Sequence, residues 1–511
     1  MNNNSRTAKA IKNSTISLIS QICFLLVSFT CRTIFTYLLG AQYLGINGLF
    51  SNILVMLSFA ELGVGSALVY RMYEPLATGN MQKLAAYVNL YKKIYRWVMA
   101  VIAFLGILII PFLPYLVHAP QVHESLTLLY LLYLLDTIVS YMYVYKKSIL
   151  IADQKDYIVS IYSQVFNIIA HVLQIIFLLL THNFVIYCLI RTGGVLLNNI
   201  ACSRKADKIY RSLQTTNPEP LSNKEISQLK TDVKGLLLTK VASVTFSGTD
   251  NLFISAFIGI QYVGILSNYT LLLTTFNGMM NRVFSSITAS VGNLAVTGTS
   301  EQMEKILKKM FFLNTAIYGY VCIGIVLLIQ QFVTQIWLTP EYTLSQTIIF
   351  LMIFELFLRS IHYPLYTTRM AMGCFSQHRI WFAVMAVINI ILDFMWVKPY
   401  GIAGLFVATI LCRGTIYFID LWVVYHEQWK ISIWNYLKPM GFWIIFLLSI
   451  TWFINKSLYL ISYSGYVGFI LKILLVTLLY VLFVLVVFGR SEEFAYYKKM
   501  AYKLLCKGKG I

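Results

Sequence analysis

The sequence predicts an all-α integral membrane protein with about fourteen transmembrane helices, and three observations support this fold class. Of its residues, 59% are hydrophobic and only 12% are charged, whereas about a quarter of the residues of a soluble domain are charged. Apolar stretches of about 20 residues recur along all 511 residues, and each is long enough to cross the hydrocarbon core. Backbone groups in lipid must be satisfied within the segment, so these stretches are expected to be helices.

The individual spans are read as apolar runs between polar breaks. Residues 1–13 lack the small-residue cleavage site of a signal peptide, so the first apolar run is expected to remain in the protein. The expected spans are 14–38, 46–70, 95–116, 126–146, 157–180, 184–203, 234–257, 264–286, 310–333, 344–366, 379–397, 402–425, 434–455 and 465–488.

The positive charges predict the orientation of the chain. The formal net charge is +20, and about 31 of the 40 Lys and Arg residues lie in alternate connections between spans. The opposite connections carry only Lys398 and Lys456. Because cytoplasmic loops collect Lys and Arg, both termini are expected in the cytoplasm, which requires an even number of spans. A nucleic-acid partner is not expected, since no folded domain is left to carry a basic face.

The sequence contains no pattern typical of a metal site or of a disulfide framework. The eight cysteines contain no CxxC pair, most of them lie inside spans, and the seven histidines show no ligand spacing. The cysteines are therefore interpreted as small apolar packing residues. No cofactor or metal is expected, and H⁺ or Na⁺ is the candidate coupling ion.

The chain contains an internal repeat. Residues 40–46 (GAQYLGI) match residues 259–265 (GIQYVGI) at five of seven positions, at an offset of 219. A second echo follows at an offset of 222, where Asn167-Ile168-Ile169 matches Asn389-Ile390-Ile391 and Arg191 matches Arg413. Six expected spans separate the copies, so both halves have the same orientation, as in transporters built from parallel repeats.

This repeat predicts the domain organisation. Two six-helix lobes are expected at 1–210 and 233–428, joined by a hydrophilic cytoplasmic linker at 211–232. Two further helices and a basic cytoplasmic tail occupy 429–511. Such lobes suit alternating access, in which they rock about a central site.

Charged residues inside the spans are the candidate functional groups, because a charge at the bilayer centre is costly and usually faces a partner or a wet cavity. The arginines among them match phosphate with a planar fork of donors and predict an anionic substrate. The candidate substrate-binding residues are Arg32, Arg191, Arg359 and Arg413, and the candidate ion-coupling or cavity carboxylates are Glu61, Asp136, Asp250 and Glu355.

Structural roles compete with these functional ones. Glu355, Arg359 and His362 share one helical face, so the first two can form an ion pair that only holds helices together. Arg191 and Arg413 can equally be packing residues duplicated with the repeat, and the carboxylates can be satisfied by hydrogen bonds across the bundle. Four charges near the ends of spans are expected at the membrane interface, namely Lys240, Arg282, Asp420 and Lys472.

Two segments near the N-terminus resemble a known family. They are 59–70 (FAELGVGSALVY) with 73–77 (YEPLA), and 37–40 (YLLG) running into 43–50 (YLGINGLF). Both are similar to the bacterial polysaccharide repeat-unit flippases (Wzx type) of the multidrug/oligosaccharidyl-lipid/polysaccharide exporter superfamily. The close match covers about the first 100 residues, and the rest agrees in helix number and topology.

The resemblance implies a flippase that moves undecaprenyl-diphosphate-linked oligosaccharide across the bacterial cytoplasmic membrane, for capsule, exopolysaccharide or O-antigen synthesis. Its partners would be that lipid-linked glycan, membrane lipids, and the polymerase and glycosyltransferases of the same pathway. Arg32 would engage the diphosphate, with Glu61 as a coupling group. No enzymatic activity is expected.

Two alternatives remain open. An ion-coupled multidrug exporter of the same superfamily would favour an acidic or aromatic cavity. A polytopic polysaccharide polymerase would resemble chains with a large outer loop, whereas here the outer connections are short. No phosphate-binding glycine loop is present, so ATP use is not expected.

Overall fold

The computed structural model describes residues 3–61, 63–117, 122–215, 217–297, 299–372, 376–461, 463 and 465–507. Within these ranges it does not describe the side chains of 3–23, 59–60, 214–215, 232, 234–247, 281–297, 371, 376–379, 501 and 503–507. Lys240, Arg282, Cys23, Cys374 and Cys506 therefore lie outside the described side chains. All regular secondary structure in the described chain is helical, which agrees with the expected all-α class.

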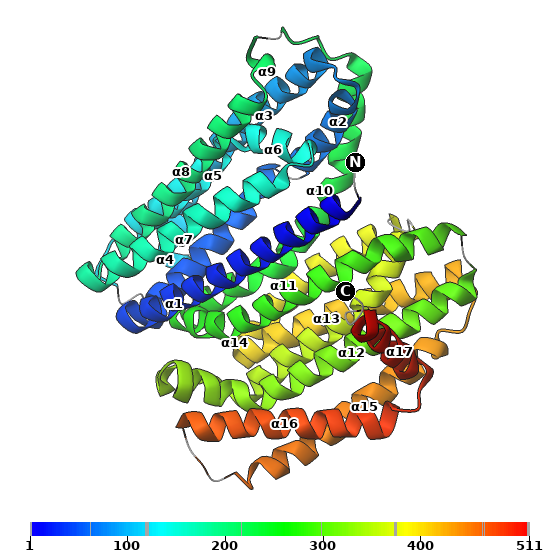
Figure 1. The fold of residues 1–511 in the computed structure, drawn as a ribbon. Helices are drawn as coiled ribbons and strands as arrows, with labels where there is room; N and C mark the ends of the chain where they lie inside the picture. The colour runs from blue at the N-terminus through cyan, green and yellow to red at the C-terminus, as the bar shows by residue number, and fades with distance from the viewer. Residues whose placement is uncertain are drawn as a thin grey trace. The chain divides into compact units, whose positions relative to one another are not determined.

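The chain divides into two compact units, Met1–Gly264 and Ile265–Ile511. The first contains α1 (Asn3–Leu57), η1 (Ser58–Glu61), α2 (Val64–Thr78), α3 (Met81–Ile109), η2 (Ile110–Phe112), α4 (Leu113–Leu116), α5 (Leu126–Tyr141), α6 (Val144–Ala152), α7 (Asp156–Thr181), α8 (Phe184–Ile209), α9 (Ser212–Thr215) and α10 (Asn223–Phe257). Helix α11 (Ile260–Thr297) begins in this unit and continues into the second (Figure 1).

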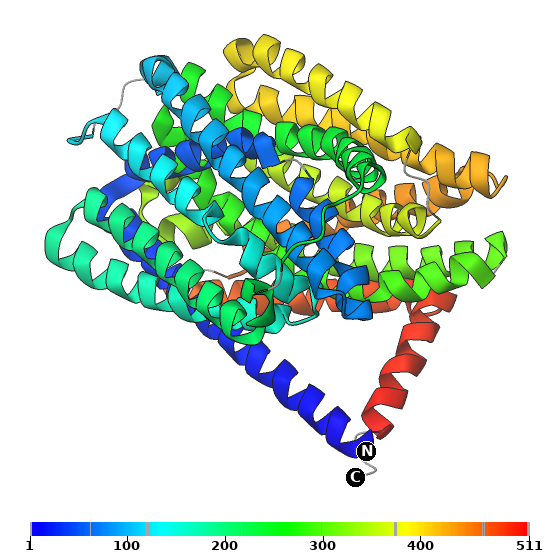
Figure 2. The same cartoon turned by 90° about the horizontal axis from the view of Figure 1, so that it is seen from above.

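The second unit continues with α12 (Ser300–Gln331), η3 (Phe332–Trp337), η4 (Pro340–Tyr342), α13 (Gln346–Ala371), α14 (Ser376–Trp422), η5 (Val423–Gln428), α15 (Trp434–Leu458), α16 (Gly465–Phe488) and α17 (Glu492–Lys507). Here α12 packs against α13, α15 and α16, and α13 packs against α14. Figure 2 shows α17 turning away from the end of α16, and Tyr497 on α17 donates a hydrogen bond to the Lys309 carbonyl at 3.2 Å.

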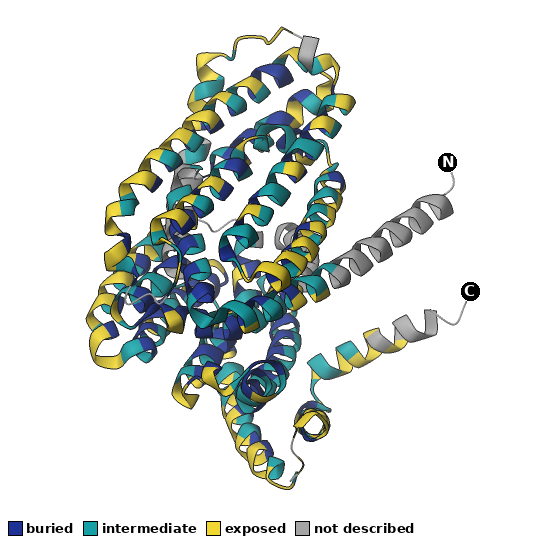
Figure 3. Cartoon of the chain, turned by 90° about the vertical axis from the view of Figure 1, so that its left-hand side faces the viewer, coloured by how far each residue is buried: buried dark blue, intermediate teal, exposed yellow. Residues whose placement is uncertain are grey.

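In the described parts of the chain, nine helices are long and apolar enough to cross a membrane, or ten when the bent pair α5–α6 is counted as one span. The protein is therefore a multi-pass membrane protein by helix length and composition. Along the described parts of the long helices, buried and exposed residues occur together, as the dark blue and yellow segments of Figure 3 show. The number fourteen and the cytoplasmic placement of both termini stay predictions.

Two of the expected gaps between spans fall at kinks where two helices meet. Gly40 (φ 81°), within α1, lies between the expected spans 14–38 and 46–70, and Gly401 (φ 59°), within α14, lies between 379–397 and 402–425. The expected span 46–70 is instead broken between Leu57 and Val64, and 126–146 bends by 43° between α5 and α6. Hydropathy averages over such breaks because a kink changes backbone direction without changing composition.

Side-chain caps explain where several helices begin. The Asn183 carboxamide accepts from the backbone N–H groups of Val185 and Ile186, at 2.8 and 3.2 Å, and starts α8. Thr299 and Gln302 form a capping box at the start of α12. Ser222 and Glu225 form another, so α10 begins inside the hydrophilic segment expected to be a linker.

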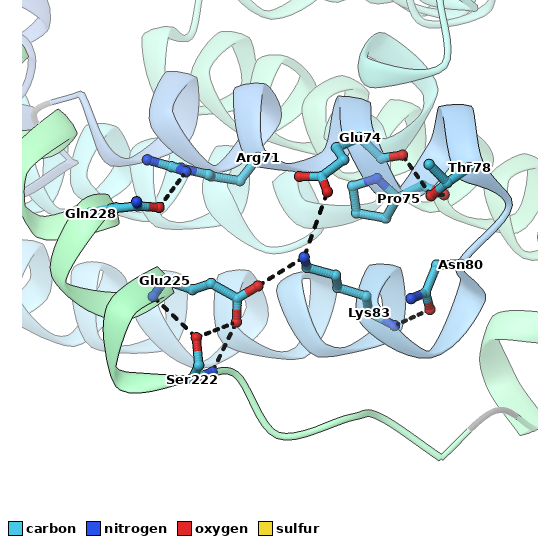
Figure 4. A network of polar contacts seen from close by, with 9 residues as sticks. All are labelled: Arg71, Glu74, Pro75, Thr78, Asn80, Lys83, Ser222, Glu225 and Gln228. Carbon is cyan, nitrogen blue, oxygen red and sulfur yellow. Dashed lines mark hydrogen bonds and ion pairs between the residues drawn. The ribbon is translucent and has the colours of Figure 1, made fainter.

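The start of α10 is anchored to α2 and α3 by a polar network (Figure 4). Lys83 Nζ lies 2.8 Å from Glu225 Oε1 and 3.9 Å from Glu74 Oε1. Arg71 donates a hydrogen bond to Gln228 Oε1 at 3.1 Å. The start of α10 is thus held against α2 and α3, and Glu225 serves both this contact and the helix cap.

The two copies of the glycine motif lie against each other. An ideal Cβ on Gly45 would lie 2.0 Å from the carbonyl oxygen of Ile260, and one on Gly264 would lie 1.8 Å from that of Ala41. The repeat relates Gly45 to Gly264 and Ala41 to Ile260, so each of these two contacts becomes the other when the two copies of the repeat are exchanged. Only glycine permits this approach of two helix backbones. The short sequence match therefore marks a local symmetric contact.

The boundary between the compact units falls after Gly264, and α10 packs against α1 within the first unit. The sequence assigns α10 to the second lobe. A repeat copy and a compact unit need not share limits, so the lobes at 1–210 and 233–428 stay a prediction.

Candidate functional site

In the first unit, a carboxylate and an arginine from two neighbouring helices form an ion pair. Asp136 lies on α5 and Arg191 on α8, and Arg191 Nη2 is 3.0 Å from Asp136 Oδ2. Asp136 is buried, with 8% of its surface exposed, whereas Arg191 is half-buried. The guanidinium also lies over the ring of Tyr133, 5.0 Å from its centroid. Burial without such a partner would be costly for either charge, so the pair explains how both are tolerated.

Polar residues extend this pair toward α1. Asn47 Oδ1 accepts hydrogen bonds from the Tyr133 hydroxyl at 2.5 Å and from Arg191 Nη1 at 3.4 Å. The charges of Arg191 and Arg32 both act on the hydroxyl of Tyr187. Arg32 is half-buried on α1 and therefore belongs to the same polar region as Arg191. The first unit thus brings together two of the four arginines singled out in the sequence.

In the second unit, one carboxylate on α13 is shared by two arginines. Arg359 Nη2 on α13 is 2.7 Å from Glu355 Oε1, and Arg413 Nε on α14 is 3.2 Å from the same oxygen. The Glu355 side chain is 12% exposed, whereas that of Arg359 is 45% exposed. The expected pairing of Glu355 with Arg359 is therefore present, and Arg413 joins it from the neighbouring helix.

The ion pairs of the two units are related by the internal repeat. Glu355 follows Asp136 at the offset of 219 found for the glycine motif, and Arg413 follows Arg191 at the offset of 222. In both units the carboxylate and the arginine approach to within about 3 Å across two packed helices, α5 with α8 and α13 with α14. Sequence reasoning found the arginine match but missed the carboxylate match, because Asp and Glu are different letters at that position.

A buried charge cluster in the second unit corrects one expectation. Asp420 was expected at the membrane interface, but it is 0% exposed. His362 Nε2 lies 2.7 Å from Asp420 Oδ2, and Arg369 Nε lies 3.3 Å from Asp420 Oδ1. Arg369, which the sequence placed in a cytoplasmic connection, is only 2% exposed. A residue near the end of a span need not lie at the membrane interface, because its side chain can instead face a neighbouring helix.

This cluster adjoins the Glu355 group through an aromatic ring. The rings of His362 and Tyr417 are stacked, with centroids 4.0 Å apart. The charges of Arg413, Glu355 and Arg359 act on the Tyr417 hydroxyl. The sequence already placed His362 on the same helical face as Glu355 and Arg359. Its pairing with Asp420 could be predicted only by knowing which face of α14 packs against α13.

The remaining expected site residues lie elsewhere. Glu61, at the end of η1, accepts a short hydrogen bond from the Tyr95 hydroxyl on α3. Asp250 is half-buried on α10. Lys472 on α16, expected at the interface, donates to Gln331 Oε1 on α12 at 3.0 Å. In the part of the chain that the structure describes, no three His, Cys, Asp or Glu residues gather as a metal site would require.

The arrangement can exchange one anion for another. The carboxylates of Asp136 and Glu355 each accept from an arginine, and the same guanidinium donors can also bind a phosphate. Protonation of the carboxylate, or arrival of a stronger anion, would release those donors without unfolding the helices. A bound phosphate could then take the place of the carboxylate.

Comparison with known proteins identifies the fold. No protein-family model matches the chain, and neither does any curated protein sequence. Among solved structures, the lipid II flippase MurJ in an inward closed conformation matches with a TM-score of 0.67 over 93% of this chain and 99% of that one, at 17% identity. An inward-facing multidrug resistance MATE family transporter of the MOP superfamily matches with a TM-score of 0.59 over 78% and 92%, at 12% identity.

The chain shares the fold of these two solved structures. A MOP transporter from Pyrococcus furiosus also matches, with a TM-score of 0.51 over 80% of this chain and 93% of that one, at 12% identity. Identities this low establish the fold and nothing finer. The resemblance seen in the sequence thus agrees with the fold, and both the superfamily and the repeat-unit flippase subtype belong with the proposed function.

Proposed function

We propose that this protein is a flippase that translocates polyprenyl-diphosphate-linked oligosaccharide repeat units across the bacterial cytoplasmic membrane. The observation that carries the proposal is the duplicated carboxylate–arginine pair, Asp136–Arg191 and Glu355–Arg413, which joins packed helices in each unit of a MOP-like fold. The MurJ structure, which resembles this chain over most of its length, is that of a lipid II flippase. A lipid-borne diphosphate is the class of substrate that such arginines would recognise.

Local charge favours an anion in each unit. In the first, Arg32 and Arg191 stand against Asp136, and in the second, Arg359 and Arg413 stand against Glu355. Two arginines thus lie near one carboxylate in each group. Because the donors of an arginine match a phosphate, a diphosphate is the class of anion that such groups would receive during transport.

The carboxylates supply a route for coupling. When an arginine turns from its carboxylate to a phosphate, the carboxylate loses its counter-charge and binds a proton more readily. Release of the phosphate would restore the ion pair and expel the proton. H⁺ is thus the coupling ion that this chemistry favours over Na⁺, and alternating access between the duplicated lobes remains the proposed transport cycle.

The test is transport of a labelled polyprenyl-diphosphate oligosaccharide in proteoliposomes containing the full-length protein. Arg191→Gln and Arg413→Gln should each reduce the rate about 10- to 100-fold, the loss expected for one charge-assisted hydrogen bond to phosphate. Arg32→Ala should also abolish transport. Lys456→Gln, which removes an exposed charge at the end of α15, is the matched control and should leave the rate unchanged. Full transport by well-folded Arg191→Gln and Arg413→Gln variants would refute the proposal.

A multidrug exporter is the second candidate, because the MATE transporter structure also resembles this chain. A pump for cationic drugs would present a carboxylate to its substrate, whereas both duplicated carboxylates here are held by arginines. Drug efflux that survives Arg191→Gln but fails in Asp136→Asn would favour the exporter. Neighbouring glycosyltransferase and polymerase genes would favour the flippase and its pathway partners.

A further inference from the structure

A basic pocket in the first unit lies apart from the duplicated ion pairs. It has a volume of about 280 Å³ and is lined by Lys92, Tyr95, Arg96 and Met99 of α3, together with Met142, Tyr143 and Tyr145 at the bend between α5 and α6. The 43° bend opens this space, since a straight helix would carry α6 along the line of α5. The pocket therefore depends on a break that hydropathy does not reveal.

Two cations on the wall are uncompensated. Lys92 and Arg96 are four residues apart, so they share one face of α3. Among the described residues, neither forms an ion pair with a carboxylate. Lys92 Nζ lies 5.7 Å from the centroid of the Tyr145 ring, and the charge of Arg96 acts on the Tyr145 hydroxyl. Both charges are thus directed to the same side of the pocket.

The neighbouring charges do not neutralise this pair. Lys146 follows the pocket on α6, but its ammonium is bound to Asp207 Oδ2 on α8 at 2.6 Å. Glu61 accepts a hydrogen bond from the hydroxyl of Tyr95, which lines the pocket. Lys92 and Arg96 remain as the two positive charges available to a ligand. Tyrosine hydroxyls from the facing segment can add neutral hydrogen bonds.

An apolar surface begins next to the cations. On α3, Trp97 is 67% exposed and Phe104 is 63% exposed, and Met142, which follows the end of α5 and lines the pocket, is also exposed. Trp97 and Phe104 are seven residues apart, so they lie on one helical face that continues along the expected span 95–116. A charged pocket at the foot of an exposed apolar face matches an amphiphile with an anionic head and hydrocarbon chains.

We propose that this pocket binds the phosphate headgroup of an anionic phospholipid at the membrane surface. Lys92 and Arg96 bind the phosphate, Tyr143 and Tyr145 border the headgroup, and the acyl chains lie along the exposed face of α3. Basic pockets between transmembrane helices on the cytoplasmic side are known to hold such headgroups. The positive-inside pattern places Lys92 and Arg96 on that side.

The test measures lipid binding to the full-length protein, delipidated in a neutral detergent, by native mass spectrometry. Dioleoyl phosphatidylglycerol is titrated against dioleoyl phosphatidylcholine. Wild type should prefer phosphatidylglycerol, and Lys92→Gln/Arg96→Gln should weaken its binding at least about tenfold, the effect of losing charge-assisted contacts. Lys93→Gln/Lys208→Gln removes the same number of charges from exposed positions and should bind like wild type.

Two further arms make the result decisive. Met99→Trp keeps both charges but fills the pocket, so it should also lose the preference for phosphatidylglycerol, provided its elution on size exclusion matches wild type. Inorganic phosphate is added in parallel and followed by thermal shift. Equal phosphatidylglycerol binding by all variants, or equal binding of both lipids by wild type, would overturn the proposal. A response to inorganic phosphate without a lipid preference would assign the pocket to a free anion and overturn it as well.

Discussion

Replacing Asp420 by Asn should destabilise the second unit strongly. The aspartate is 0% exposed, and its partner Arg369 is only 2% exposed, so the substitution removes a negative charge that lies 3.3 Å from a buried guanidinium. Breaking a buried pair from one side costs about 3–5 kcal/mol. For a unit spanning Ile265–Ile511, that loss lowers the melting temperature by on the order of 10 °C. The expected consequence is an early, separate loss of folded protein on heating.

The assay is thermal challenge of the detergent-solubilised protein followed by fluorescence-detected size exclusion. Lys308→Gln is the control, because Lys308 is 38% exposed and its pair with Glu304, at 3.0 Å, contributes about 1 kcal/mol or less. Asp420→Leu combined with Arg369→Met replaces the pair with apolar side chains and should recover much of the loss. A melting temperature for Asp420→Asn within the error of that for Lys308→Gln would refute the reasoning.

Two further predictions concern the first unit. Hydrogen bonds from Lys83 and Ser222 lower the pKa of Glu225 from 4.5 to about 2, so the anchoring of α10 should persist at mildly acidic pH and be lost as pH falls from about 4.5 toward 2. Hydrogen exchange over 217–231 would follow this release, and Glu225→Gln should show fast exchange even at neutral pH; slow exchange in that variant would disprove the anchor. Gly264→Ala should prevent normal folding, because its Cβ would lie 1.8 Å from a backbone carbonyl, whereas Gly193→Ala meets nothing within 4 Å and should be tolerated. Equal yields of monodisperse protein from both glycine variants would contradict that contact.

The breaks in the helices mark the limit of local sequence information. Long apolar runs determine membrane helices because burial in lipid depends on composition over about 20 residues. The run at 465–488 became α16 with the same limits. The bend between α5 and α6 and the break before α2 change direction over a few residues, which hydropathy averages away. The basic pocket beside Lys92 owes its existence to one of these bends.

By itself, the sequence determined that this is a helical membrane protein, that it carries an internal repeat, and that charged residues lie within its apolar segments. Only the tertiary structure decided their partners: Arg191 with Asp136, Arg413 with Glu355, and Asp420 with Arg369. The physical reason is range. Hydropathy and charge count are properties of a segment, whereas an ion pair between helices depends on which faces meet, and that is set by packing of residues far apart in the chain.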